Sequence, residues 1–271
     1  MTSELGLGTY AFFWEGAHAL PGGETASPLP LAGMLERTAA LGLGLFQICD
    51  YAPLLGFSVD ELRELKATAD GLGIRLELGT KGVAPAHLRS FLELARALDA
   101  RYVRSMLFAP DSRPTLSEAE RMLNEVLPAY EEAGVGLGLE TYEQVSSTEL
   151  VALVESIGSG ALGICLDPAN TVAALEHPRE VVERCAPYVT GIHVKDFAFS
   201  RRDGWVGFTL AGARMGEGLL DYAHLTATVR PAERGITRIV EHWLPWQGDL
   251  ESTVAAERDW TAHNVGYLKE H

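Results

Sequence analysis

The sequence predicts a (β/α)8 TIM barrel, folded as one domain over residues 1–271. Eight short apolar segments alternate with eight segments of helical spacing at intervals of roughly 30 residues, and no proline- or serine-rich linker divides them. Such alternation implies a parallel sheet, and eight units suit a closed barrel with its chemistry at the carboxyl ends of the strands. An open doubly wound sheet is the alternative. It usually has a glycine-rich phosphate turn after its first strand, whereas Gly6-Leu7-Gly8 leads into aromatic residues.

The expected strands are short apolar runs bounded by turn residues. They cover residues 5–13, 45–50, 75–80, 102–108, 135–140, 162–166, 189–194 and 236–241. The expected helices cover residues 31–41, 58–72, 85–98, 115–133, 147–157, 178–185, a segment starting at 221, and 250–268. Ser58 and Glu61 have the spacing of a capping box. Residues 15–30 and the glycine-rich segment 197–220 are expected to be irregular; the second could close over a site or mediate subunit contacts.

The bulk composition narrows the possible partners and compartments. A net charge of −15 argues against a nucleic-acid backbone or an anionic membrane as a partner. The three cysteines are widely spaced and form no CxxC pair, which fits a reducing cytoplasm. Neither a signal peptide nor an apolar run of the roughly 18 residues that span a bilayer is visible. A cytoplasmic enzyme with a small-molecule substrate, possibly a homo-oligomer, is therefore expected.

Polar residues end four consecutive strands of this pattern. Glu140 ends the fifth strand, Asp167 follows the sixth, His193 lies near the end of the seventh, and Glu241 ends the eighth. Each follows several apolar residues, so each should be semi-buried, where a charge is costly unless it is paired or bound to metal. A salt bridge explains any one of them alone, but four at equivalent positions predict a metal site. Three carboxylates and one imidazole suit one divalent cation: we expect Mn²⁺, with Mg²⁺ or Co²⁺ as alternatives.

Several segments resemble one known superfamily. These are Leu139-Glu140-Thr141, Cys165-Leu166-Asp167-Pro168-Ala169-Asn170, Ile192-His193-Val194-Lys195-Asp196, Gly216-Glu217-Gly218 and Ile239-Val240-Glu241. They are similar to motifs of the xylose isomerase-like TIM-barrel superfamily, which includes sugar phosphate isomerases/epimerases and the AP endonuclease family 2 type. The resemblance implies that Glu140, Asp167, His193 and Glu241 bind one divalent metal. It also implies that Glu140 and Glu241 are catalytic and move protons on opposite faces of the substrate.

The resemblance leaves the reaction open among a few related outcomes. Metal-assisted enolisation of a small keto-sugar or sugar acid, through a metal-bound enediolate, gives isomerisation or epimerisation, which is the first expectation. The alternative is a lyase, a dehydratase or decarboxylase of an oxo-sugar acid, on the same metal site. Asn170 stands where the epimerases usually carry a histidine, which weighs against a standard ketose 3-epimerase. An endonuclease is disfavoured because it would need more histidines at the strand ends and a basic face.

Five further residues are predicted to bind the substrate. Lys195 shares a strand face with His193, Lys81 follows the third strand, and Arg104 interrupts the apolar fourth strand. Several basic groups near one rim of an acidic chain suggest an anionic carbohydrate. Asn170 and Trp243 complete the set, the tryptophan as an apolar wall against the sugar.

Overall fold

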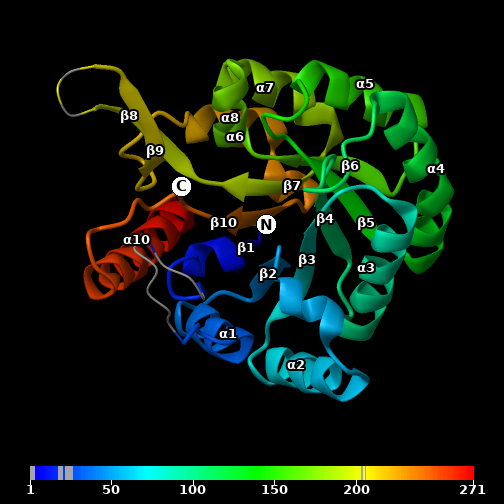
Figure 1. Cartoon of the computed structure of the whole chain (residues 1–271), viewed down its shortest axis with the longest axis horizontal. Helices are drawn as coiled ribbons and strands as arrows, with labels where there is room; N and C mark the ends of the chain where they lie inside the picture. Colours follow the sequence, from blue (N-terminus) through cyan, green and yellow to red (C-terminus); the bar gives the residue numbers. More distant parts are fainter. Residues whose placement is uncertain (1–3, 18–20, 22–26, 203, 205) are drawn as a thin grey trace.

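The computed structural model describes residues 4–17, 21, 27–202, 204 and 206–271 (Figure 1). Its centre is a closed parallel barrel, which confirms the predicted fold class. The barrel strands are β1 (Leu5–Gly8), β2 (Leu45–Cys49), β3 (Arg75–Lys81), β4 (Tyr102–Met106), β5 (Gly136–Glu140), β6 (Leu162–Leu166), β7 (Val189–Val194) and β10 (Thr237–Val240). They are hydrogen-bonded in the order β1-β10-β7-β6-β5-β4-β3-β2, so β1 and β10 close the ring.

Helices surround the strands on the outside (Figure 1). They are α1 (Leu31–Ala40), α2 (Val59–Gly71), α3 (Pro85–Leu98), α4 (Leu116–Ala133), α5 (Ser147–Ile157), α6 (Pro168–Thr171), α7 (Pro178–Cys185), α8 (Tyr222–Val229), α9 (Pro231–Arg234) and α10 (Leu250–Glu270). Short 3₁₀ helices cover η1 (Thr9–Phe12), η3 (Ala52–Gly56), η4 (Val172–Ala174) and η5 (Ala186–Tyr188). The predicted capping box of Ser58 and Glu61 is present, and Thr115 forms another with Glu118 at the start of α4.

The strands are buried on both faces, which explains why they read as continuous apolar runs. Every residue of β2, β4 and β6 is buried. The barrel interior is filled at mid-height by Tyr102, whose ring lies so close to Gly138 and Gly191 that a Cβ at either position would collide with it. Glycine in β5 and β7 therefore makes room for this packed centre, while the polar groups gather above it at the carboxyl ends.

Two predicted segments differ from the structure. The strand expected over residues 5–13 ends at Gly8 and continues as η1, whose first residue, Thr9, donates a hydrogen bond to the Cys49 carbonyl. The segment 197–220, expected to be irregular, contains an antiparallel hairpin made of β8 (Asp196–Arg201) and β9 (Phe208–Ala213). Neither strand has a regular alternation of apolar and polar residues, and the glycines around them suggested a loop. The hairpin projects beyond the ring of helices (Figure 1).

Part of the expected loop over residues 15–30 lies outside the described residues. Among the described residues, no helix combines the length and the hydrophobicity that spanning a bilayer would require.

Glu257 of helix α10 binds the segment that follows η1 near the start of the chain. This carboxylate, 1% exposed, accepts hydrogen bonds from the backbone N–H groups of Trp14 (2.8 Å) and Glu15 (3.1 Å). Burial raises its pKa from 4.5 to about 7, although the two backbone donors oppose the shift. The unfolded chain therefore releases this proton at a lower pH than the folded protein does.

We expect Glu257 to make the protein less stable as pH rises. Its contribution to the free energy of unfolding is fully present below pH 4.5 and is lost as pH approaches 7, by up to about 3 kcal/mol. Urea unfolding of wild type and Glu257→Gln at pH 5 and pH 7.5 measures this, because only wild type should lose stability at this site. Glu251→Gln, an exposed change on the same helix, is the control. An equal difference between wild type and Glu257→Gln at both pH values would contradict the expectation.

Candidate metal centre

The four predicted metal ligands meet at the carboxyl ends of neighbouring strands. Glu140 ends β5, Asp167 follows β6, His193 lies in β7 and Glu241 follows β10. One potential ligand atom from each lies within 4.8 Å of the others, and all four residues are buried. The parallel register keeps them near one another on neighbouring strands: Cys165, two residues before Asp167, pairs with Glu140, and Ile239, two residues before Glu241, pairs with His193. The cluster could hold a divalent cation.

The donor chemistry fits a divalent cation. One buried oxygen of each carboxylate accepts no hydrogen bond among the described residues: Glu140 Oε2, Asp167 Oδ2 and Glu241 Oε1. Each instead lies beside a nitrogen that carries or can carry positive charge, at 2.7 Å from Arg104, 2.8 Å from Lys195 and 3.3 Å from His193. Buried anionic oxygens in this state attract positive charge, and oxygen-rich donor sets with one imidazole suit Mg²⁺, Mn²⁺ or Co²⁺.

The orientation of His193 is set by residues below it in the barrel. Its Nε2 lies 2.8 Å from Gln47 Oε1, and the Gln47 amide nitrogen donates to Glu77 at 3.2 Å. The amide thus presents its oxygen to the imidazole, so Nε2 carries the proton and Nδ1 is left as the ligand atom. Nδ1 faces Glu140 at 3.0 Å and Glu241 at 3.3 Å. Metal-binding histidines commonly have such a partner for the ring nitrogen that does not bind the metal.

The carboxylates of the cluster differ in their electrostatic surroundings. Burial alone would raise the pKa of Glu140, but Arg104 and His193 bring it down to about 2. Burial raises the pKa of Asp167 to about 6, with Lys195 opposing the shift. For Glu241, burial is outweighed by His193 and Lys195, which lower the pKa of its carboxyl group. Glu140 and Glu241 are therefore weak bases in this setting.

The five predicted substrate-binding residues all lie at or beside the cluster. Lys195 Nζ is 2.8 Å from both Asp167 and Glu241 and lies over the Trp243 ring, 4.8 Å from its centroid. Arg104 points into the barrel mouth, where it pairs with Glu140. The Asn170 amide donates to Glu140 at 3.1 Å. Lys81 is farther out and forms an ion pair with Asp50 at 3.3 Å.

Sequence reasoning missed two residues of this network, Gln47 and Asp50. Asp50 accepts a hydrogen bond from the Tyr10 hydroxyl (2.8 Å) and pairs with both Arg104 (3.2 Å) and Lys81. It is one of few non-glycine residues with positive φ, at 52°, a conformation that aspartate tolerates better than most residues. Both had a sequence signal: Asp50 ends a strand as the other carboxylates do, and Gln47 interrupts an apolar strand as Arg104 does.

Fold and site together define a (β/α)8 barrel enzyme with one buried carboxylate–histidine centre. Residues 35–271 match the family model described as xylose isomerase-like TIM barrel, and the chain belongs to this family, as the sequence motifs predicted. Comparison with curated proteins finds 3-oxo-isoapionate decarboxylase of Pectobacterium atrosepticum, which is 53% identical over 264 residues covering 97% of this chain and 94% of that protein.

Solved structures of the same fold are more distant in sequence. D-Psicose 3-epimerase from Clostridium cellulolyticum H10, solved with D-tagatose, has a TM-score of 0.73 at 16% identity, covering 98% of this chain and 97% of its own. A xylose isomerase-like TIM barrel protein from Mycobacterium smegmatis, in complex with magnesium, has a TM-score of 0.70 at 17% identity, with 98% of each chain covered. At these identities the likeness shows the shared fold alone.

Proposed function

We propose that this protein is a divalent-metal-dependent decarboxylase of a small 3-oxo sugar acid. The observation that carries the proposal is the 53% identity, along nearly the whole of both chains, to 3-oxo-isoapionate decarboxylase. Isomerisation or epimerisation, the first expectation from the sequence, has support only from solved structures at 16% identity and similar values. We therefore place the lyase reaction, the alternative from the sequence, ahead of it.

The charges of the site favour an anionic substrate. Glu140, Asp167, Glu241 and Asp50 bring four negative charges, whereas Arg104, Lys195 and Lys81 bring three positive ones, all connected through ion pairs. With a divalent cation on the four ligands, the network would have one positive charge in excess. A substrate with a single carboxylate would neutralise it. A neutral ketose would leave an uncompensated charge in a buried site, which is unfavourable.

Decarboxylation also fits the weak basicity of the two glutamates. In a 3-oxo acid the bond between the carboxylate carbon and its neighbour breaks, CO2 leaves, the electron pair moves toward the keto oxygen, and the neighbouring carbon takes up one proton. When bound, a divalent cation would supply Lewis-acid stabilisation of the negative charge on the keto oxygen. No side chain has to remove a proton from carbon. Epimerisation does require such bases, and here Arg104 and Lys195 hold Glu140 and Glu241 in ion pairs.

Each neighbouring side chain has a defined part in this scheme. Arg104 and Lys195 keep positive charge beside the place where negative charge develops, in a site from which water is largely excluded. Asn170 fixes one oxygen of Glu140 by its hydrogen bond. The Trp243 ring packs against the Lys195 ammonium and supplies an apolar wall.

The test is an NMR assay in D2O with purified protein and Mn²⁺, Mg²⁺ or Co²⁺. 3-Oxo-isoapionate and other 3-oxo sugar acids are compared with D-psicose, D-fructose and D-tagatose. We expect CO2 and a product with one deuterium at the carbon that lost CO2, and we expect EDTA to stop the reaction. A new ketose signal or carbon–deuterium exchange without CO2 would instead identify an isomerase or epimerase.

A further inference from the structure

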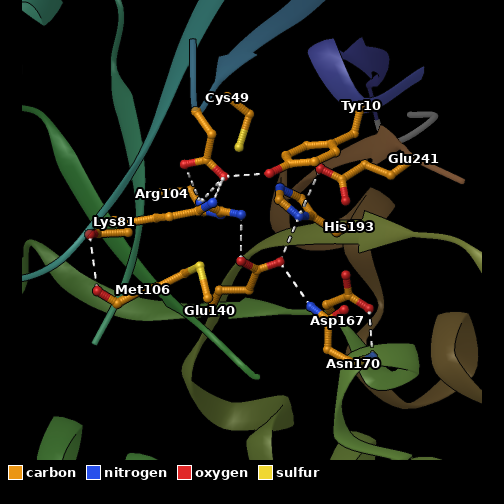
Figure 2. A network of polar contacts seen from close by, with 12 residues as sticks. Tyr10, Cys49, Lys81, Arg104, Met106, Glu140, Asp167, Asn170, His193 and Glu241 are labelled. Atoms are coloured by element: carbon orange, nitrogen blue, oxygen red, sulfur yellow. Dashed lines mark hydrogen bonds and ion pairs between the residues drawn. The ribbon is translucent and has the colours of Figure 1, made fainter. Parts of the chain in front are cut away.

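A cavity of about 380 Å³ opens beside the metal centre. It lies at the carboxyl ends of β2, β3 and β4, and its polar lining includes Asp50, Thr80, Lys81, His87, Asp111 and Ser112. Its volume is in the range of small-molecule sites. At its inner end, the Arg104 guanidinium contacts Asp50 at 3.2 Å with one nitrogen and Glu140 at 2.7 Å with another (Figure 2). Arg104 therefore connects Asp50, which lines this cavity, with Glu140 of the predicted ligand set.

Lys81 differs from the other two cations of the network. The side chains of Arg104 and Lys195 are each 4% exposed, and each pairs with two carboxylates. The Lys81 side chain is 39% exposed and lines the cavity, and within the described part of the chain it has one ion pair, with Asp50 at 3.3 Å. Asp50 already pairs with Arg104 and accepts a hydrogen bond from Tyr10. Two of the three ammonium N–H donors of Lys81 are therefore available to a ligand.

From these contacts we propose that Lys81 binds the carboxylate of the substrate at the inner end of this cavity. The inference rests on the proposed function and adds an orientation to it: the group that leaves as CO2 lies on the β2–β4 side of the metal centre. An anion here would balance the one positive charge that the network has in excess. To pair with this anion, Lys81 would leave Asp50. Asp50 would keep its ion pair with Arg104 and its hydrogen bond from Tyr10.

The other polar groups of the cavity are compatible with this assignment. Asp111 is an acidic group in the lining, but it is exposed, so water screens its charge. His87 Nε2 lies 2.6 Å from the Thr80 hydroxyl, and burial lowers the pKa of His87, so the ring is neutral near pH 7. These side chains and Ser112 can exchange hydrogen bonds with sugar hydroxyls. Among the described lining residues, Lys81 is the one lysine or arginine.

The experiment compares an acid with its neutral counterpart in a binding measurement that needs no turnover. D-Gluconate and D-sorbitol have the same hydroxylated carbon chain. Gluconate ends in a carboxylate where sorbitol has a hydroxymethyl group. Their affinities are measured by calorimetry, with Mg²⁺ present, for wild type, Lys81→Met, Lys81→Arg and Lys66→Met. Lys66 pairs with Asp70 on the surface of α2 and serves as the matched control.

We expect wild type to bind gluconate more tightly than sorbitol. Lys81→Met should weaken gluconate binding by about 10- to 100-fold, the loss of a charged hydrogen bond, and leave sorbitol binding unchanged. Lys81→Arg should retain most of the affinity, and Lys66→Met all of it. Equal gluconate affinity in wild type and Lys81→Met, an equal loss for both probes, or no preference of wild type for gluconate would each overturn the inference. Absence of CO2 release by wild type would overturn the proposed function and leave these binding results to stand.

Discussion

Replacing Asp167 by Asn is expected to remove the bound cation and, with it, the activity. The two oxygens of this carboxylate have different contacts. Oδ1 accepts hydrogen bonds from the backbone N–H groups of Ala169 (3.1 Å) and Asn170 (3.3 Å), and Oδ2 faces the cluster beside Lys195. Asparagine can keep the first interaction through its carbonyl oxygen. It then turns a neutral NH2 group, itself a donor, toward Lys195 and the cation site, where neither can accept a hydrogen bond.

We expect metal affinity to fall by at least about 100-fold, the upper end of what the loss of an outer-shell partner costs. The CO2 release rate should fall by roughly 10²- to 10³-fold with the lost charge stabilisation. Metal content by mass spectrometry and CO2 release measure the two effects separately. Asp221→Asn is the control, because Asp221 caps α8 by accepting a hydrogen bond from the backbone N–H of His224 in the same way, but its ion pair is with Arg179 and not with a residue of the cluster. Wild-type metal content in Asp167→Asn would refute the ligand assignment.

The second large effect is expected at Asp196, on stability rather than on chemistry. Its Oδ1 accepts hydrogen bonds from the backbone N–H groups of Phe197 and Leu220, and its Oδ2 accepts from those of Gly216 and Gly218, at 2.8–3.0 Å. The residue is 1% exposed. A buried carboxylate thus joins the start of β8 to the return segment after β9, and it fixes the root of the hairpin next to Lys195.

Asp196→Asn replaces one of these oxygens with an NH2 group. That group would face two backbone N–H groups and cannot accept a hydrogen bond from either. We expect the free energy of unfolding to fall by roughly 3–5 kcal/mol, since two hydrogen bonds to a charged group are lost. Urea unfolding measures this, and limited proteolysis should show earlier cleavage between residues 196 and 220. Asp249→Asn, a change at the exposed cap of α10, should leave the free energy of unfolding nearly unchanged, because asparagine caps helices as well as aspartate does. Equal unfolding free energies for the two variants would contradict this account.

Much of the fold could be predicted because the barrel strands are buried on both faces and bounded by turns. The four cluster residues could be predicted for a related reason. Glu140, Asp167, His193 and Glu241 interrupt apolar runs at corresponding points, and parallel strands bring corresponding points to one rim. Their roles as metal ligands and proton carriers remain predictions, as do a single domain, a homo-oligomer and a cytoplasmic location.

What the sequence did not predict depends on contacts between distant segments. Asp50 ends a strand as the other carboxylates do, but its contact with Arg104 depends on a left-handed backbone conformation that the sequence pattern does not predict. The β8–β9 hairpin escaped notice because its strands lie outside the barrel repeat and its glycines suggested a loop. The pairing of each glutamate with a cation, which favours decarboxylation over proton abstraction, likewise comes from strands far apart in sequence.

The closure of the barrel by β1 and β10 has a consequence for synthesis of the chain. Strand β1 leaves the ribosome long before its partner along one edge, Thr237–Val240, because the whole of the remaining barrel lies between them in the sequence. At typical elongation rates the interval is on the order of tens of seconds. During this time β1 and its neighbours present open hydrogen-bonding edges, which invite pairing with other nascent chains. The brevity of β1, with four residues of which two are glycine, limits that hazard until the ring can close.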